Sequence, residues 1–152
     1  ELRLFLPFEV DDYLIIAVWT KGHDREVFGY IGQVWKFLQI HRSDLMDRKV
    51  IFIGDLNSNV IWDRKDRWWN HSDGVREFAE INIFSLYHTQ FNQHAGKEKH
   101  PTFYMYKNKQ KPYHIDYAFC SADVLAKSTI EIGCFDEWID QSDHMALIVD
   151  IK

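Results

Sequence analysis

The hydrophobic residues of this chain gather in short runs that polar segments separate. Residues 13–19, YLIIAVW, are rich in β-branched and aromatic side chains, and the length of the run suits a buried strand. Residues 49–54, KVIFIG, have the same character and also predict a central strand. Between the two runs, apolar residues recur at helical spacing, which predicts an amphipathic helix from about Arg25 to His41. The first third of the chain is therefore expected to alternate strand and helix.

The second half of the chain has the character of a β-rich region. Three strands are predicted there, at residues 115–120, 129–134 and 145–151. Residues 102–106 form a further aromatic segment. Residues 59–70 have the composition of an irregular surface loop, after which Ser72 or Asp73 is expected to cap a short helix ending near Ile81. Strands mixed with two or three helices predict a layered α/β or α+β fold.

The composition indicates a packed core and excludes extensive disorder. Hydrophobic residues make up 46% and aromatic residues 16% of the 152 residues, with no internal repeat or Gly/Ser linker. We therefore interpret residues 1–152 as one domain or a large piece of one. No apolar stretch is long enough for a membrane span, and no signal-peptide pattern opens the sequence. Cys120 and Cys134 have neither metal-ligand spacing nor a disulfide framework, which favours a reducing, cytoplasmic location.

Polar side chains with catalytic potential occur where three of the predicted strands begin or end. The segments are Gly54-Asp55-Leu56-Asn57, His114-Ile115-Asp116-Tyr117 and Ser142-Asp143-His144. Each one alone is more often structural, because an Asp-x-Asn turn commonly bonds its own backbone and a single histidine is usually not catalytic. If the three strands are neighbours in one sheet, however, their polar ends converge on one edge.

Hydrolysis of a phosphodiester requires a set of side chains of this kind. A hard divalent cation binds carboxylate oxygens, and the attacking water needs a base or an anion that orients it. The transition state needs donors for its developing negative charge, which an asparagine and a cationic histidine can supply. An aspartate bonded to that histidine would raise the pKa of the imidazole and keep it charged. The candidate residues are Asp55, Asn57, Asp116, Asp143 and His144.

Three longer motifs resemble one known family. The stretches VIFIGDLNSN, PTFYMYKNKQKPYHIDYAFCS and SDHMALIVDI stand in the order and at the spacings typical of the endonuclease/exonuclease/phosphatase superfamily, which contains DNase I, exonuclease III and the abasic-site endonucleases. The resemblance extends from about Tyr13 to the end of the chain. It implies a single partial domain of a DNase I-like layered β-sandwich with flanking helices. This chain would supply the second half of that fold plus one strand of the first.

The resemblance also implies a role for each candidate residue. Asp55 would orient or deprotonate the attacking water and lie close to a Mg²⁺ or Mn²⁺ ion. Asn57 would donate to a phosphate oxygen. Asp116 would support the catalytic His144, which would contact the scissile phosphate. Asp143 would be a carboxylate on the metal side.

Two features of this sequence depart from the family's pattern. The family's main metal ligand, a glutamate in an early strand, and the asparagine before it have no counterpart in residues 1–12. Where the family usually has a tyrosine or histidine after the first apolar strand, this chain has Trp19, with His23 just beyond. A half-sandwich would expose the apolar inner face of its sheet, so we expect a missing amino-terminal half, a second copy or another chain to cover it. The isolated chain is expected to be weakly active or inactive.

Basic and aromatic residues indicate where a substrate would bind. Between Lys97 and Lys111, five lysines stand against one glutamate among aromatic residues, a mixture that suits a nucleic-acid backbone and its bases. A solvated hairpin with its aromatic side chains in the core explains the same segment equally well. The net charge of −5 does not itself indicate nucleic-acid binding. The candidate substrate-binding residues are Trp19, His23, Trp62, Lys107, Lys109 and Lys111.

Three functions follow from these observations. The leading hypothesis is a Mg²⁺- or Mn²⁺-dependent nuclease that hydrolyses phosphodiester bonds by in-line attack of water. The second keeps the fold and makes the protein a phosphatase acting on nucleotide or inositol phosphates. The third is a catalytically weak fragment or binding scaffold, since the family's metal-binding glutamate has no counterpart in this chain. The lysine-rich aromatic segment favours nucleic acid among the substrates.

Overall fold

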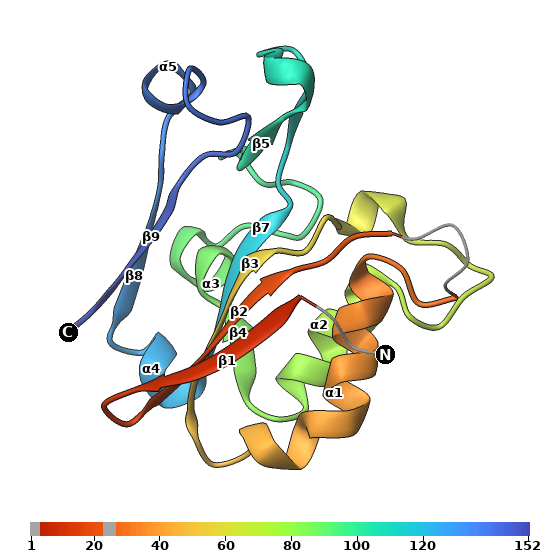
Figure 1. The fold of residues 1–152 in the computed structure, drawn as a ribbon, viewed down its shortest axis with the longest axis vertical. Helices are drawn as coiled ribbons and strands as arrows, with labels where there is room; N and C mark the ends of the chain where they lie inside the picture. Colours follow the sequence, from red (N-terminus) through yellow and green to blue (C-terminus); the bar gives the residue numbers. More distant parts are fainter. Residues whose placement is uncertain (1–3, 23–26) are drawn as a thin grey trace.

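A five-stranded mixed sheet forms the centre of the molecule (Figure 1). The computed structural model describes residues 4–22 and 27–152. The strand order in the sheet is β1-β2-β3-β7-β4, and only β2 and β3 run parallel to each other. The bounds of these strands are β1 (Phe5–Val10), β2 (Tyr13–Trp19), β3 (Lys49–Asp55), β4 (Ile83–Ser85) and β7 (Asp116–Ser121).

Two helices, α1 (Ile31–Leu45) and α2 (His71–Ala79), cover one face of this sheet (Figure 1). Side chains alternate along a strand, so every second residue of β2 points toward the helices and is buried. Aromatic rings fill the space between sheet and helices, and the ring of Phe78 on α2 stacks on Phe119 of β7 at 4.6 Å between centroids. This layer anchors β3 and β7, the two strands whose ends carry the candidate carboxylates.

The opposite face of the sheet packs against shorter elements. These are α3 (Leu86–Phe91), α4 (Ala122–Leu125) and an antiparallel pair, β8 (Ser128–Ile132) and β9 (Leu147–Ile151). The side chain of Gln90 bonds the backbone N–H and C=O of Ile130, each at 2.8 Å, so α3 is fixed to β8. Cys120 is buried in this layer, and burial raises the pKa of its thiol to about 12. The thiol of Cys134 is also free.

A hairpin and three short helical segments complete the described chain. The hairpin pairs β5 (Phe103–Tyr104) with β6 (Pro112–Tyr113) and projects beside the helix α5 (Phe135–Trp138) at the top of Figure 1. The 3₁₀ turn η2 (Met105–Lys107) lies at its tip, and η1 (Val60–Trp62) follows β3. No helix among the described residues has both the length and the apolar character that crossing a bilayer requires.

The layered α/β fold expected from the sequence is confirmed, as are the strands at residues 13–19 and 49–54. The first helix is wrong at both ends, since α1 runs from Ile31 to Leu45 and part of its predicted start, residues 25–26, lies outside the described residues. Val27 is 70% exposed and Tyr30 has a φ of 52°, a left-handed conformation that a helix does not continue. The start of α2 is also corrected, because Asn70 caps the helix and its backbone N–H donates to the carboxylate of Asp73 at 2.8 Å.

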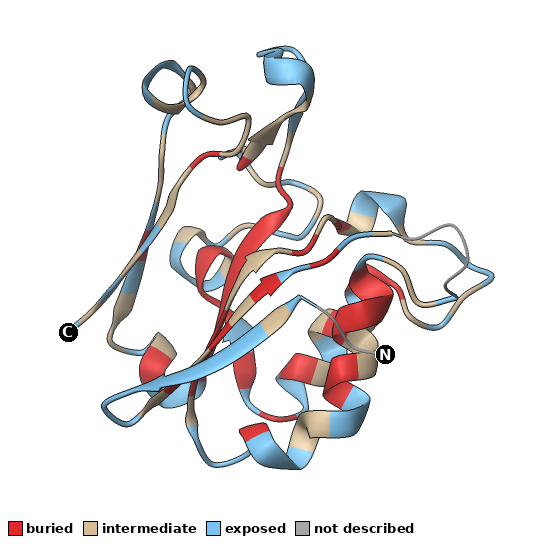
Figure 2. Cartoon of the chain, in the orientation of Figure 1, coloured by how far each residue is buried: buried red, intermediate tan, exposed pale blue. Residues whose placement is uncertain are grey.

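The edge strand β1 exposes an apolar row that the sequence pattern did not predict as a strand. Leu6, Phe8 and Val10 are 64%, 42% and 48% exposed, and β1 appears almost entirely in the exposed colour in Figure 2. Their partners across the strand pair are Ala17, Ile15 and Tyr13, so all six lie on the face opposite to α1. We call Leu6, Phe8 and Val10 the β1 apolar row. An unpaired apolar edge of this kind is a common site of association.

Candidate active site

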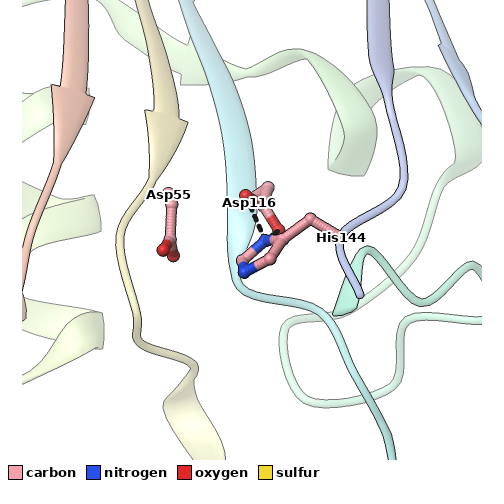
Figure 3. A group of neighbouring side chains, drawn as sticks. All are labelled: Asp55, Asp116 and His144. Atoms are coloured by element: carbon pink, nitrogen blue, oxygen red, sulfur yellow. Dashed lines mark hydrogen bonds and ion pairs between the residues drawn. The ribbon is translucent and has the colours of Figure 1, made fainter. Parts of the chain in front are cut away.

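Asp55 and Asp116 meet because two neighbouring strands run in opposite directions. Asp55 is the last residue of β3, Asp116 is the first of β7, and the antiparallel register pairs them directly. His144 comes from the loop before β9. One potential ligand atom from each of Asp55, Asp116 and His144 lies within 4.8 Å of the others (Figure 3). The structure therefore brings together residues from all three segments that the sequence singled out.

His144 is held by Asp116. The Nδ1 atom of His144 lies 3.1 Å and 3.0 Å from the two carboxylate oxygens of Asp116 (Figure 3). The hydrogen bond to Asp116 raises the pKa of His144, and the charges of Asp116, Asp55 and Asp143 act in the same direction against the opposing effect of burial. The imidazole thus favours its charged form and has its Nε2–H available for a second acceptor.

Asp55 is a carboxylate under electrostatic strain. Burial and the neighbouring charge of Asp116 raise its pKa to about 6, although bonds from Asn57 partly oppose the rise. Its oxygens accept the backbone N–H of Asn57 at 2.7 Å and the side-chain Nδ2 of Asn57 at 2.6 Å. Asn57 itself has a left-handed φ of 44° and donates to the carbonyl of Thr20 at 2.8 Å. Two adjacent carboxylates that repel each other form a site that a cation would stabilise.

Asp143 lies beside the group without entering it. Its carbonyl accepts the N–H of Tyr104 at 2.8 Å, which joins the loop before β9 to the β5–β6 hairpin. Its charge raises the pKa of His144, but its carboxylate is not part of the close group that Asp55, Asp116 and His144 form in the described chain.

Thr102 is a residue of the site that sequence reasoning missed. Its side chain is fully buried, and its Oγ1 accepts the N–H groups of Ile115 at 2.9 Å and Asp116 at 3.0 Å. Its carbonyl accepts the N–H of Met145 at 2.7 Å, one residue after His144. Thr102 therefore joins the backbone of Asp116 to that of Met145, the residue after His144. The sequence contains Thr102 within the PTFY motif, but a single threonine does not predict that its hydroxyl accepts backbone N–H groups from a distant strand.

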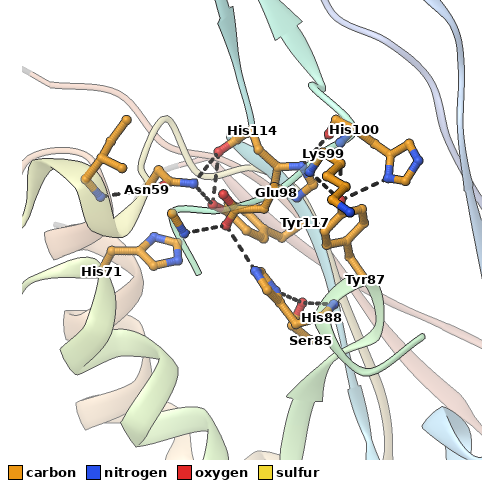
Figure 4. A network of polar contacts seen from close by, with 12 residues as sticks. Asn59, His71, Ser85, Tyr87, His88, Glu98, Lys99, His100, His114 and Tyr117 are labelled. Carbon is orange, nitrogen blue, oxygen red and sulfur yellow. Dashed lines mark hydrogen bonds and ion pairs between the residues drawn. The ribbon is translucent and has the colours of Figure 1, made fainter. Parts of the chain in front are cut away.

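A buried polar network supports the site from below (Figure 4). The side-chain Nδ2 of Asn59 donates to the carbonyl of His114 at 3.0 Å and to the hydroxyl of Tyr117 at 3.1 Å, so the loop after β3 is fastened to the start of β7. Glu98 bonds His88 at 3.0 Å. Burial raises the pKa of Glu98, but the bonds from His88 and from backbone N–H groups outweigh it and bring the value to about 2. This network fixes the two strand ends that carry Asp55 and Asp116.

The aromatic residues proposed for substrate binding lie around the group. Trp19 ends β2 directly opposite Asp55 in the sheet, is half exposed, and has the ammonium of Lys21 5.2 Å from its ring. Trp62 is 42% exposed and lies 5.4 Å from the ring of Tyr113. His23 falls outside the described residues.

The three candidate lysines lie on the β5–β6 hairpin. Lys107 donates to the carbonyl of Asp140 at 3.1 Å, and Lys109 bonds the carboxylate of Asp136 at 3.1 Å. Lys111 has its ammonium 5.3 Å from the ring of Tyr106. Two of these lysines therefore tie the hairpin to the segment that includes α5, in addition to any contact with substrate.

The donor set fits a hard divalent cation in part. Asp55 and Asp116 offer carboxylate oxygens, which Mg²⁺ and Mn²⁺ prefer, whereas Nδ1 of His144 is already used by Asp116. Mg²⁺ usually keeps several waters and takes only one or two carboxylates from a protein, so two carboxylates suffice for binding of this type.

Solved structures with the same architecture include exonucleases and AP endonucleases, while no family model and no curated protein matches the sequence. The 3′-5′ exonuclease NExo from Neisseria meningitidis matches with a TM-score of 0.74 and 15% identity, over 99% of this chain and 65% of that one. A 3′ phosphatase NExo from Neisseria bound to a product DNA hairpin matches with a TM-score of 0.73 and 13% identity, over the same shares. An AP endonuclease from Archaeoglobus fulgidus matches with a TM-score of 0.67 and 14% identity, over 97% of this chain and 65% of that one.

These similarities agree with the expected architecture. At identities of 13% to 15% they show the fold, and the chain spans about 65% of the length of each of these structures. The chain therefore has the DNase I-like fold of these solved structures.

Proposed function

We propose that this chain is part of a divalent-metal-dependent phosphoester hydrolase whose substrate is nucleic acid. The observation that carries the proposal is the His144–Asp116 pair facing Asp55 within 4.8 Å. A charged imidazole beside a partly buried carboxylate of raised pKa, that of Asp55, supplies an acid-type donor and a base in one site. The similar structures, described as an exonuclease, a 3′ phosphatase bound to DNA and an AP endonuclease, support the same class of reaction.

In the proposed reaction, a water molecule attacks phosphorus in line with the leaving oxygen. Asp55 orients this water and accepts its proton, and a pKa of about 6 suits a base that works near neutral pH. His144, kept charged by Asp116, donates from Nε2 to the phosphate as negative charge develops there. Asn57 exchanges its bond to Asp55 for a bond to a phosphate oxygen.

Mg²⁺ or Mn²⁺, held by Asp55 with Asp143 on the same side, would supply charge neutralisation at the phosphate. Asp143 is the residue before His144, its backbone is fixed by a bond from Tyr104, and its charge acts on His144, which supports its place on the metal side. Asp116 is already committed to His144 through both of its oxygens, which favours Asp55 over Asp116 as the principal ligand in this chain.

Nucleic acid is the substrate that the surrounding residues favour. Trp19, beside Asp55 in the sheet, and Trp62, which lines a hollow together with Asn57, are exposed aromatic side chains, and base stacking on such rings is largely independent of sequence. Lys107, Lys109 and Lys111 place positive charge on the hairpin that leads into Asp116. The alternative of a phosphatase acting on a nucleotide end has one observation in its favour, the similarity to a protein described as a 3′ phosphatase.

A further polypeptide is also part of the proposal. The chain spans about 65% of the similar structures, and the β1 apolar row is exposed on the face opposite to α1. We infer that an additional amino-terminal segment or a second chain covers this face and adds a carboxylate to the metal site. Activity of the isolated chain is then expected to be weak.

Cleavage assays test this function directly. The chain is incubated with labelled DNA, labelled RNA and bis(p-nitrophenyl) phosphate, with and without Mg²⁺ or Mn²⁺. Metal-dependent cleavage should fall by about 100-fold or more in Asp55→Ala and in His144→Ala. Asp44→Ala, which removes an exposed carboxylate of α1, is the matched control. Cleavage that both active-site variants retain would contradict the assignment.

A further inference from the structure

A hollow opens next to the catalytic group, on the side of the loop that follows β3. It has a volume of about 560 Å³, within the range of small-molecule sites in proteins. Asn57 forms part of its lining, together with Tyr30, Trp62, Asp63, Arg64 and Arg67. We call it the η1 pocket. Because Asn57 also bonds Asp55, the η1 pocket and the catalytic group share a wall.

The lining of the η1 pocket combines aromatic rings with guanidinium groups. Tyr30 and Trp62 are 50% and 42% exposed, so their rings are accessible from solvent. Arg67 uses Nε for Asn70 at 2.7 Å and one Nη for the carbonyl of Trp62 at 3.3 Å, and no bond to its other Nη is formed within residues 4–22 and 27–152. A flat ring beside a fixed guanidinium matches a base attached to a phosphate.

Among the described residues of the lining, Asp63 is the acidic one, and its carboxylate accepts bonds from backbone groups. The carboxylate of Asp63 accepts the N–H of His71 at 2.9 Å and the N–H of Ser72 at 3.2 Å, at the amino-terminal end of α2. An anion entering the pocket therefore meets Arg64 and Arg67 with little competition from Asp63. Within the described lining, two guanidinium groups stand against one carboxylate, in a protein whose net charge is −5.

The loop that forms the η1 pocket is held in one shape before any ligand binds. The buried side chain of Asn70 accepts the N–H of Arg64 at 2.9 Å and donates to the carbonyls of Arg64 and Arg67, both at 2.9 Å. In Figure 1 this loop, with η1, lies beside the start of α1. A preformed pocket loses less conformational entropy on binding than a mobile loop would.

We propose that the η1 pocket binds one nucleotide of the substrate strand, the one adjacent to the scissile phosphate. Its base stacks against Trp62 and Tyr30, and its phosphate is bound by Arg64 and Arg67. This assignment rests on the proposed nuclease function, because the bound nucleotide is part of a substrate only if the chain cleaves nucleic acid. The pocket would thereby select a strand that extends past the cleaved bond, in preference to a small phosphate ester that ends there.

Binding without cleavage tests the proposal. The probe is a fluorescein-labelled single-stranded pentadeoxynucleotide, titrated with the full chain in EDTA and followed by anisotropy at several NaCl concentrations. Trp62→Ala should weaken binding roughly tenfold, the order expected for loss of one stacked base, whereas Trp62→Phe should restore most of the affinity. Arg64→Gln should lower the slope of log K against log[salt] by about 0.7, the value for one phosphate of a single strand.

Two neighbouring substitutions serve as matched controls. Trp68→Ala removes a tryptophan that is 67% exposed and outside the pocket lining, and Lys65→Gln removes the charge next to Arg64 in sequence. Both should bind like the unmodified chain. Equal losses in the pocket and control variants, or no loss in Trp62→Ala, would overturn the proposal. Inorganic phosphate carries no base, so its affinity, measured by competition with the probe, should be the same in Trp62→Ala and in the unmodified chain. A weaker affinity for phosphate in Trp62→Ala would also contradict the proposal.

The outcome for the pocket can be separated from the outcome for the proposed function. If DNA is bound through Trp62 and Arg64 but no phosphoester is cleaved with any metal, nucleotide binding in the η1 pocket is supported and the proposed hydrolase function is contradicted. If bis(p-nitrophenyl) phosphate and the pentanucleotide are both cleaved with unchanged KM in Trp62→Ala, the proposed hydrolase function is supported and nucleotide binding in the η1 pocket is contradicted. Far-ultraviolet circular dichroism and thermal unfolding of each variant establish that it has folded.

Discussion

At the scale of single residues, the chemistry of the site depends on how Asp116 changes the protonation of His144 and Asp55. Asp116 receives His144 on both oxygens and is itself buried, so its negative charge acts on the imidazole at close range with little solvent screening. Asp55 is affected in the opposite way, since the same charge of Asp116 and its own burial raise the pKa to about 6. Asp116 therefore raises two pKa values: that of His144, which stays charged, and that of Asp55, which becomes a stronger base.

Asp116→Asn tests this division of roles. The amide keeps the shape of the side chain and removes the charge, so the pKa of His144 should fall and the pKa of Asp55 should fall as well. His144 is then charged only at lower pH, and we expect metal-dependent cleavage at neutral pH to decrease by about 100-fold or more. The pKa of His144 is followed by nuclear magnetic resonance of its ring protons. An unchanged titration of His144 would show that Asp116 does not set its charge.

At the scale of elements, three segments distant in sequence are joined by a few backbone bonds. The β5–β6 hairpin contacts the loop before β9 through Tyr104 and Asp143, and Thr102 joins the same hairpin to the start of β7. The hairpin is thus a structural support of the His144–Asp116 pair. Since its lysines also bond residues near α5, the hairpin and α5 are expected to move together.

Thr102→Val should loosen this junction. The substitution keeps the volume of the side chain and leaves the buried N–H groups of Ile115 and Asp116 without their acceptor, at a cost of about 3 kcal/mol in unfolding free energy. Thr102→Ser keeps the hydroxyl and should lose much less. Urea unfolding measures both variants. Equal stability of the valine and serine variants would mean that Oγ1 contributes nothing, and the turnover number of the serine variant should stay near that of the unmodified chain.

The elements that could be predicted from the sequence are those that a short run of neighbouring residues specifies. The runs at residues 13–19 and 49–54 form the expected strands because burial on both faces makes them continuously apolar. The predicted helix began too early because Val27 and Tyr30 happened to share its spacing while lying exposed. In β1, Pro7 and Glu9 interrupt the apolar pattern, which an edge strand tolerates and a central strand does not. The candidate aspartates and His144 were found by motif, whereas Thr102 and the Asn59 bonds exist only once the chain is folded.

At the scale of the whole molecule, the two faces of the central sheet are covered unequally. Helices α1 and α2 bury the first face, while the other face has the small α3, α4 and β8–β9 layer and leaves the β1 apolar row exposed. This asymmetry is the physical basis for expecting a covering polypeptide. It also predicts how the chain behaves alone.

The isolated chain should self-associate through the β1 apolar row. Phe8→Lys combined with Val10→Lys should increase the monomer fraction in light-scattering measurements. The same change should alter the unfolding free energy by only about 0.5 kcal/mol, since both side chains are nearly half exposed. Met46→Lys, which changes a similarly exposed side chain elsewhere, is the control and should leave association unchanged. A chain that is monomeric at high concentration regardless of these changes would contradict the prediction.

The direct pairing of Asp55 with Asp116 links the site to the cooperativity of folding. These residues face each other only in one register of β3 and β7, and a slip of one residue would send Asp116 to the opposite face. β7 is buried along its whole length between β3 and β4, so its amides should exchange with solvent only through global unfolding. The site then has no partly folded precursor: a molecule either possesses the complete pair of carboxylates or has lost its central sheet. The fraction of competent molecules in a preparation should therefore equal the fraction whose β7 amides are protected from hydrogen exchange.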